Sequence, residues 1–147
     1  MYERILVTTD GSALSKKAVR SAVELAQATG AALVALHVVP RYPMSYFEGS
    51  IAMRPDEMAR TEKAWADKGQ ELVDKVASGA QAAGVKAKGV VMRSDLIAES
   101  VIAAAKKHRC DLVVMASHGR KGIKRLLLGS ETQHVLTHSQ VPVLVLR

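Results

Sequence analysis

The sequence predicts an α/β protein with a doubly wound, five-stranded parallel sheet, helices on both faces and the strand order 3-2-1-4-5. Short aliphatic runs alternate with segments of helical periodicity along the 147 residues, which is typical of consecutive βαβ units. Hydrophobic residues make up 48% of the chain and aromatic residues only 3%, so the core must use the aliphatic side chains typical of buried parallel strands. A chain of this length is expected to form a single domain over residues 1–147.

Two strands and two helices are expected in the first half of the chain. Residues 5–7, Ile-Leu-Val, form the first strand, and apolar residues at helical spacing follow it. A second buried strand covers residues 32–39. Pro55 marks the start of a long helix, in which Gly69 and Gly79 are unfavourable residues.

Three strands and two helices are expected in the second half. Residues 85–92 alternate lysines with apolar residues, as expected of an edge strand protected by charge. Ser94 or Asp95 is expected to cap the helix that follows. A buried strand over 112–115, a short helix over 130–138 and a final strand over 141–146 complete the alternation.

Composition argues against several classes of function. The 21 Lys and Arg residues exceed the 14 Asp and Glu residues, but they are spread along the chain, so nucleic-acid binding is not expected. The positive surface is expected to attract small anionic ligands instead. Cys110 is the single cysteine and cannot form an internal disulfide, which suggests a reducing compartment. No targeting segment or apolar stretch of about 20 residues is visible, so a cytoplasmic protein without membrane contact is expected.

Polar residues follow the first and the fourth predicted strands, at the points where these strands end. Thr8, Thr9 and Asp10 follow the first strand, and residues 116–119 follow the fourth. In the order 3-2-1-4-5 these strands are neighbours where the strand order reverses, and open parallel sheets bind ligands there, beyond the carboxyl ends of the strands. Thr9 and Asp10 are therefore expected to line one crevice with Ser117 and His118.

The segment after the fourth strand is typical of a phosphate site. Gly129 and Ser130 precede a predicted helix, whose first N–H groups lack partners inside the helix and carry the positive end of its dipole. Neither the P-loop motif G-x-x-x-x-G-K-[ST] nor the dinucleotide motif G-x-G-x-x-G is present. The pattern that is present reads Ala116-x-x-Gly119, nine further residues, and Gly129-Ser130.

Over essentially its whole length the chain resembles the universal stress protein family. Five segments carry the resemblance: Ile5-Leu6-Val7-x-x-Asp10-Gly11-Ser12, Leu36-His37-Val38-Val39, Asp111-Leu112-Val113-Val114-Met115, Leu126-Leu127-Leu128-Gly129-Ser130 and Pro142-Val143-Leu144-Val145. The pattern G-x-x-G-x9-G-[ST] is similar to the one that separates the ATP-binding members from the others. The chain matches it at Gly119, Gly129 and Ser130, with Ala116 in place of the first glycine. The resemblance implies a Rossmann-like fold related to the adenine nucleotide α-hydrolases.

The resemblance also implies a ligand and the residues that bind it. The ligand would be ATP, AMP or another adenine nucleotide, with Mg²⁺ carried by its phosphates. Asp10 would meet the nucleoside, the backbone of Val38 the adenine edge, and residues 115–119 the ribose and phosphates. Glu131 would have to turn its side chain away from the phosphates or meet the metal. The implied site comprises Thr8, Thr9, Asp10, Val38, Met115, Ala116, Ser117, His118, Gly119, Arg120, Gly129, Ser130, Glu131 and Thr132.

Several of these residues have a simpler structural interpretation. Asp10 could cap the first helix, although Ser12 can do so too, and Ser130 could be only a helix cap. His37, inside a strand, is expected to be a core histidine. His134 and His138 stand four residues apart, but no carboxylate or cysteine completes a ligand set nearby, so no metal site is expected.

Two segments of the predicted loops add further candidates. A basic cluster between the glycines is either a solvated face or a source of attraction for phosphate; it consists of Arg120, Lys121, Lys124 and Arg125. Three aromatic residues after the second strand form either a lid or a patch for another subunit; they are Tyr42, Tyr46 and Phe47.

Two classes of function are consistent with the sequence. The first is a regulatory stress-response protein that binds an adenine nucleotide and acts as a dimer; the second is a nucleotide-free dimeric interaction or scaffold protein of the same fold. By resemblance, the homodimer forms through the final strand, from Val141 to Leu146. No nucleophile or paired carboxylates stand at a recognisable spacing, so an enzyme is not favoured and slow ATP hydrolysis is the most that is expected.

Overall fold

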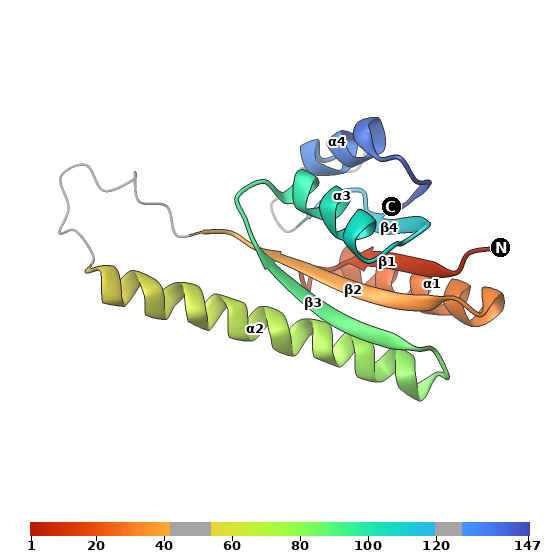
Figure 1. Cartoon of the computed structure of the whole chain (residues 1–147), viewed down its shortest axis with the longest axis horizontal. Helices are drawn as coiled ribbons and strands as arrows, with labels where there is room; N and C mark the ends of the chain where they lie inside the picture. The colour runs from red at the N-terminus through yellow and green to blue at the C-terminus, as the bar shows by residue number, and fades with distance from the viewer. Residues whose placement is uncertain (42–53, 120–127) are drawn as a thin grey trace.

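The computed structural model describes residues 1–41, 54–119 and 128–147, which form a parallel sheet covered by helices on both faces (Figure 1). The strand order is β3-β2-β1-β4-β5 and every pair is parallel, so the predicted doubly wound sheet is confirmed. The strands are β1 (Arg4–Thr8), β2 (Ala32–Val39), β3 (Ala87–Arg93), β4 (Leu112–Ala116) and β5 (Val143–Leu146).

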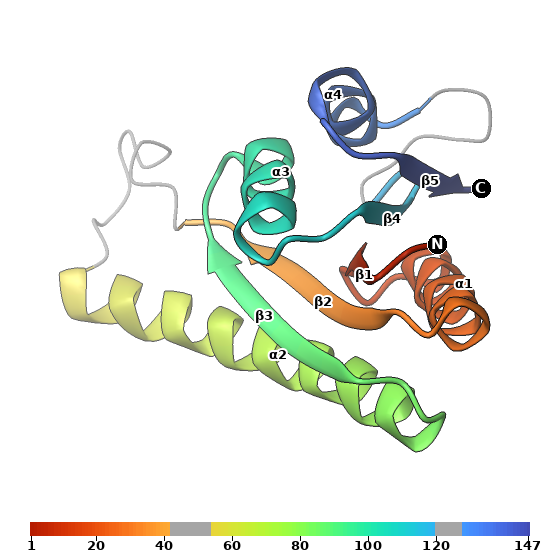
Figure 2. The ribbon, with the colours of Figure 1, turned by 45° about the vertical axis from the view of Figure 1, so that its right-hand side comes forward.

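In the described ranges, four helices connect the strands and lie in two layers. The helices α1 (Ala13–Thr29) and α2 (Pro55–Ala82) cover one face of the sheet, and α3 (Ile97–Lys107) and α4 (Ser130–His138) cover the other (Figure 2). Side chains alternate between the two faces along each strand. Ile5 and Val7 pack in the core with α1 and α2, whereas Leu6 between them packs in the core with α3 and α4.

Local signals explain where α1 begins and ends and where α2 begins. The side chain of Ser12 accepts a hydrogen bond from the Ser15 N–H and caps α1, and Gly30 ends this helix with a left-handed φ of 75°. Pro55 occupies the first turn of α2, as predicted.

The predicted cap of α3 is wrong. The residue before this helix is Leu96, and it makes no side-chain cap. Ser94 and Asp95 stand in the preceding turn, where the Ser94 hydroxyl accepts from the Leu96 N–H and the Asp95 carboxylate accepts from the Arg41 N–H. Both side chains are therefore used to hold the turn, and the N-terminus of α3 receives its acceptor from another helix.

The helix α2 is much longer than the strands it covers. Its 28 residues span about 42 Å, whereas the eight residues of β2 span about 26 Å, so its N-terminal part projects beyond the carboxyl end of the sheet (Figure 1). It packs closely on β3, since a Cβ added at Gly89 would lie 2.7 Å from Cγ2 of Val73. A side chain at Gly89 would therefore push the helix away.

The two edges of the sheet are β3 and β5. Exposed Lys88 lies on β3, in agreement with the prediction of an edge strand protected by lysines. The final strand begins at Val143, two residues later than predicted, although the Pro142 carbonyl already accepts from Val113. No helix in the described part of the chain is both long and apolar enough to cross a membrane.

Candidate functional site

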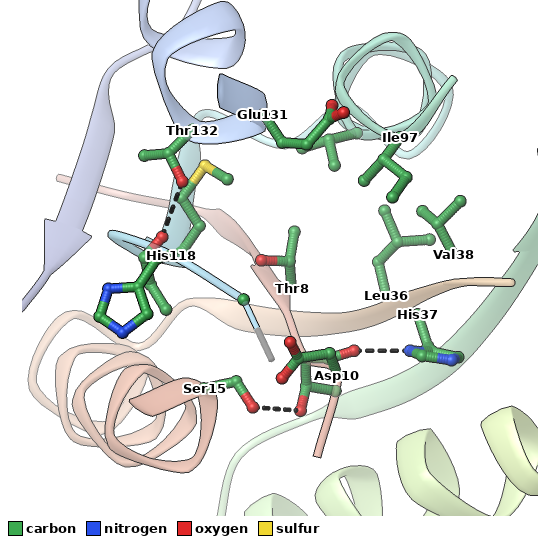
Figure 3. Close-up of a pocket in the computed structure, with 15 residues that line it drawn as sticks. Thr8, Asp10, Ser15, Leu36, His37, Val38, Ile97, His118, Glu131 and Thr132 are labelled. Carbon is green, nitrogen blue, oxygen red and sulfur yellow. Dashed lines mark hydrogen bonds between the residues drawn. The ribbon is translucent and has the colours of Figure 1, made fainter. Parts of the chain in front are cut away.

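A crevice opens beyond the carboxyl ends of β1 and β4, at the point where the strand order reverses (Figure 3). Residues from β1, β2, β4, α1, α3 and α4 line it, as the rule for open parallel sheets requires. The lining residues are Thr8, Thr9, Asp10, Ser15, Leu36, His37, Val38, Ile97, Val101, Met115, Ala116, His118, Gly119, Glu131 and Thr132.

One side of the crevice is apolar. Leu36 and Val38 stand two residues apart on β2 and share a face of the sheet, and Ile97 and Val101 stand one turn apart on α3. Figure 3 shows Leu36, Val38 and Ile97 side by side at the edge of the cavity. Such a surface suits a flat, apolar group such as an aromatic ring.

The backbone of Val38 adds a polar edge beside this apolar side. Neighbouring residues of a strand between two parallel partners direct their peptide groups to opposite sides. The Leu36 carbonyl accepts from Thr9 on the β1 side, and the Val39 carbonyl accepts from Ser94 on the β3 side. The N–H and the carbonyl group of Val38 therefore face the β1 side. The last residue pair between β1 and β2 is Thr8 with Leu36, so β1 does not extend as far as Val38.

Thr9 is the internal anchor of the corner between β1 and α1. It is only 5% exposed, its N–H donates to the Leu36 carbonyl, and its hydroxyl pairs with Ser15 at 3.2 Å. Its carbonyl accepts from Nδ1 of His37 at 2.7 Å. Each polar group of Thr9 thus has a partner inside the protein, and its side chain fixes the corner.

Asp10 follows this anchor at the mouth of the crevice. Its Oδ1 accepts from the Ser12 N–H at 2.9 Å, and the residue that caps α1 is Ser12 and not Asp10. Oδ2 of Asp10 approaches the loop after β4, because a Cβ added at Gly119 would lie 3.0 Å from it. Gly119 therefore allows the two loops to approach closely across the crevice.

Gly129, directly before α4, contacts the residues that follow β4. Its N–H donates to the Ser117 carbonyl at 2.7 Å, and an added Cβ would lie 3.2 Å from the same oxygen. Its φ is −57°, which any residue can adopt, so the close approach and not the torsion favours glycine here. The Gly129 N–H is already used, which leaves the N–H groups of Ser130, Glu131 and Thr132 as the ones that α4 itself cannot satisfy.

Ala116, the residue that departs from the family pattern, lies in regular strand. It pairs with Leu146 of β5, is 8% exposed, and its carbonyl accepts from the Thr132 hydroxyl at 2.9 Å. The only described residue other than glycine with a positive φ is Arg109. The backbone at position 116 therefore does not require glycine.

Glu131 turns its carboxylate away from the start of its own helix. Its Oε2 accepts from the Ala98 N–H at 2.9 Å, in the first turn of α3. This bond supplies the acceptor that Ser94 and Asp95 do not provide, and it places a negative charge at the positive end of α3. Of the two alternatives for Glu131, the side chain that points away is the one observed.

The two histidines of α4 contact each other and one carboxylate. The rings of His134 and His138 lie 4.3 Å apart, and Nε2 of His134 lies 3.4 Å from Oε1 of Glu99. Across residues 1–41, 54–119 and 128–147, no three His, Cys, Asp or Glu side chains gather in a way that could hold a metal ion.

Most of the predicted site residues line the crevice. The exceptions are Ser117 and Gly129, which are hydrogen-bonded to each other, and Ser130, which is exposed at the start of α4. Arg120, the rest of the basic cluster, and Tyr42, Tyr46 and Phe47 lie outside the described residues.

Sequence reasoning missed five lining residues: Ser15, Leu36, His37, Ile97 and Val101. The spacing of Leu36 and Val38 could have identified one of them, because residues two apart in a strand share a face. His37, which the sequence assigns to the core, is half-buried and is among the residues that line the crevice.

A five-stranded parallel sheet in the order 3-2-1-4-5, with helices on both faces and a crevice at its switch point, defines a doubly wound α/β protein, a class in which ligands bind at the carboxyl edge of the sheet. The model of the universal stress protein family matches residues 1–147, and the chain belongs to this family. A universal stress protein of Methanocaldococcus jannaschii is 33% identical over 147 residues, which cover the whole chain and 83% of that relative.

Solved structures share the fold. The universal stress protein UspA from Lactobacillus plantarum is 25% identical, with a TM-score of 0.82 over 99% of this chain and 98% of that one. A universal stress protein solved in complex with cAMP is 26% identical, with a TM-score of 0.65 over 99% of this chain and 97% of the other.

Proposed function

We propose that this protein binds an adenine nucleotide, such as ATP or AMP, in the crevice and acts as a regulatory protein of the stress response. The observation that carries the proposal is the backbone of Val38, whose peptide groups face the crevice beyond the end of β1. A hydrogen-bonding edge beside an apolar surface is what a purine ring requires.

The purine would lie against the apolar side of the crevice. Leu36, Ile97 and Met115 provide contact surface, and the peptide groups of Val38 provide a donor and an acceptor for the polar edge of the base. Backbone recognition of this kind selects for the pattern of donors and acceptors on the base, so adenine and guanine should differ in affinity.

The ribose and the phosphates would extend toward Asp10 and the start of α4. The Asp10 carboxylate is a suitable acceptor for ribose hydroxyls. The N–H groups of the first turn of α4 and its helix dipole favour the phosphates. Because the Glu131 carboxylate is bound at α3, its charge lies away from these N–H groups.

The comparison with the cAMP complex supports this ligand class. That protein resembles this chain over almost its whole length at 26% identity. In the described part of the chain no cluster of metal-binding side chains is present, so Mg²⁺ would be held by the phosphates of the nucleotide. In this proposal the protein acts through the presence or absence of the bound nucleotide, and slow hydrolysis of ATP is the greatest enzymatic activity expected.

A homodimer through β5 is part of the proposal. This strand is one edge of the sheet, and Leu144 on it is 40% exposed, as is Leu136 on α4. An apolar edge strand is prone to pair with another chain, and a second copy would satisfy its backbone groups. Light scattering should give twice the chain mass, and a Leu144→Lys variant should give the monomer mass.

Calorimetric titration with ATP, AMP, cAMP and GTP tests the function, together with mass spectrometry of small molecules released from the purified protein. We expect saturable binding of an adenine nucleotide and weaker binding of GTP. The informative variant is Ser130→Asp, because a carboxylate suits the first turn of a helix but repels phosphate. Ser130→Ala is its matched control. Absence of binding at millimolar nucleotide would favour the nucleotide-free interaction protein.

A further inference from the structure

The ring of His37 holds the corner between β1 and α1 from the side of β2. Its Nδ1 lies 2.7 Å from the Thr9 carbonyl oxygen, a bond marked in Figure 3. A carbonyl oxygen only accepts hydrogen bonds, so Nδ1 carries the proton. The bond fixes the orientation of the peptide group that joins Thr9 to Asp10.

The opposite side of the same ring rests on the bare backbone of Gly69 in α2. A Cβ added at Gly69 would lie 2.6 Å from Cδ2 of His37 and 3.3 Å from Cγ2 of Val39. The first distance is too short for any real contact, so the ring would have to move. It cannot move freely, because Nδ1 is bound to Thr9 on its other side.

This contact explains a glycine that helix propensity disfavours. Gly69 is buried in the interior of α2, where glycine costs about 1 kcal/mol relative to alanine. Gly79 lies in the same helix, and no atom is within 4 Å of the Cβ it would carry. The two glycines therefore differ: Gly69 lies against the ring that is bound to the Thr9 carbonyl, whereas Gly79 faces open space.

We propose that Gly69 and His37 form a positioning pair that sets the orientation of Asp10 at the nucleotide crevice. The proposal rests on the proposed function for its ligand and on the structure for its geometry. The backbone of Gly69 leaves room for the imidazole of His37, and the imidazole donates to the Thr9 carbonyl. This bond fixes the peptide group between Thr9 and Asp10, and so orients Asp10 toward the ligand. His37 is a positioning residue in this scheme and makes no contact with the nucleotide.

Four single variants test the pair. His37→Leu keeps an apolar side chain of useful size but removes the donor, whereas His37→Asn retains an N–H group at the position of Nδ1. Gly69→Ala displaces the ring, and Gly79→Ala is its control in the same helix. ATP affinity is measured by calorimetry at a temperature where circular dichroism shows each variant to be folded.

The expected result is a specific pattern of affinities. His37→Leu and Gly69→Ala should each weaken ATP binding about fivefold, the change that corresponds to one lost hydrogen bond. His37→Asn and Gly79→Ala should bind within about twofold of the wild type. In a His37→Ala background, Gly69→Ala should no longer affect affinity, because the displaced ring is absent. Equal affinities for Gly69→Ala and Gly79→Ala, or failure of His37→Asn to restore binding, would overturn the proposal.

A second measurement needs no nucleotide, so it separates this inference from the proposed function. Nuclear magnetic resonance of the ligand-free protein should identify His37 as the tautomer protonated at Nδ1. The amide signals of Asp10 and Ser12 should shift in Gly69→Ala and stay in place in Gly79→Ala. If the wild type bound no nucleotide, the proposed function would fail. The amide signals would still show whether Gly69 and His37 determine the conformation of the turn between β1 and α1.

Discussion

The carboxylate of Glu131 accepts a hydrogen bond from the Ala98 N–H at 2.9 Å, so the first turn of α4 caps the first turn of α3. The bond holds an acidic side chain away from the N-terminus of α4. Without this bond, the negative charge of Glu131 could lie at that N-terminus and repel a phosphate group. The bond also joins the two helices whose first turns border the crevice, since Ile97 and Thr132 both line it. One carboxylate thus links the border of the crevice to the packing of α3 and α4 on this face of the sheet.

A Glu131→Gln variant should bind ATP about threefold more tightly, because an amide still accepts from Ala98 but removes a negative charge from the border of the crevice, where it weakly repels an anionic ligand. Its free energy of unfolding should fall by about 0.5 kcal/mol, since the charge at the start of α3 is lost. Titrations with ATP and adenosine check this, with adenosine affinity expected to stay constant. A loss of ATP affinity that depends on Mg²⁺ would instead show that the carboxylate meets the metal.

An Asp10→Asn variant should weaken binding of ATP and adenosine alike, by about tenfold, because the acceptor for the ribose loses its charge. The amide oxygen can still accept from Ser12, so the unfolding midpoint should change little. Asp111→Asn is the matched control: this carboxylate accepts from the Glu3 and Arg4 N–H groups next to the amino end of β1, far from the crevice. Equal losses of affinity in both variants would contradict the site.

An Ala116→Gly variant restores the family pattern but should increase neither the stability of the protein nor its affinity for ATP. Position 116 lies in regular, buried strand, where glycine costs about 0.5–1 kcal/mol. ATP affinity should stay within about twofold, because the backbone there already has an ordinary conformation. Urea denaturation measures the change in unfolding free energy, and calorimetric titration measures the ATP affinity. A gain in affinity of tenfold or more would mean that the alanine methyl group obstructs the ligand.

The contribution of Asp111 to stability should depend on pH. Burial acts against ionisation of this carboxyl, but the hydrogen bonds from the Glu3 and Arg4 N–H groups outweigh it and lower the pKa from its ordinary value of 3.8. A carboxyl with a lowered pKa stabilises the folded protein above the pKa of the unfolded chain, and this stabilisation is lost as pH falls through the folded value. The difference in unfolding free energy between wild type and Asp111→Asn should therefore be largest near neutral pH and shrink below about pH 4.

Cys110 should react slowly with iodoacetamide. Burial raises the pKa of its thiol to about 11, and the side chain is 6% exposed. At pH 8 the reactive thiolate should be about 100-fold scarcer than in an exposed cysteine. Mass spectrometry of the modified protein over time checks this, with the urea-unfolded chain as the fast reference. Modification of the folded chain at the unfolded rate would contradict the burial.

The sheet and its order could be predicted from the sequence because hydrophobic periodicity is a local signal. The aliphatic runs at β1, β2 and β4 are buried on both faces, so they read as strands without any knowledge of their neighbours. The carboxyl edge then follows from chain direction alone, which is why Asp10 and His118 were expected together and both line the crevice.

Contacts between distant segments could not be predicted. The cap of α3 was assigned to Ser94 or Asp95 because capping rules consider neighbouring residues, whereas the observed acceptor is Glu131, 33 residues away. Gly69 was interpreted as a weak point of α2 for the same reason. Its role depends on the ring of His37, and no pattern within the helix indicates which strand side chain will reach it.

Nuclear magnetic resonance titration of the labelled protein with ATP tests whether an adenine nucleotide occupies the crevice beyond β1 and β4. We expect saturable shifts of the amide signals of Val38, Asp10, Ser130 and Thr132, with little change at Asp111. Shifts confined to other surfaces, or no shifts at millimolar ATP, would contradict it.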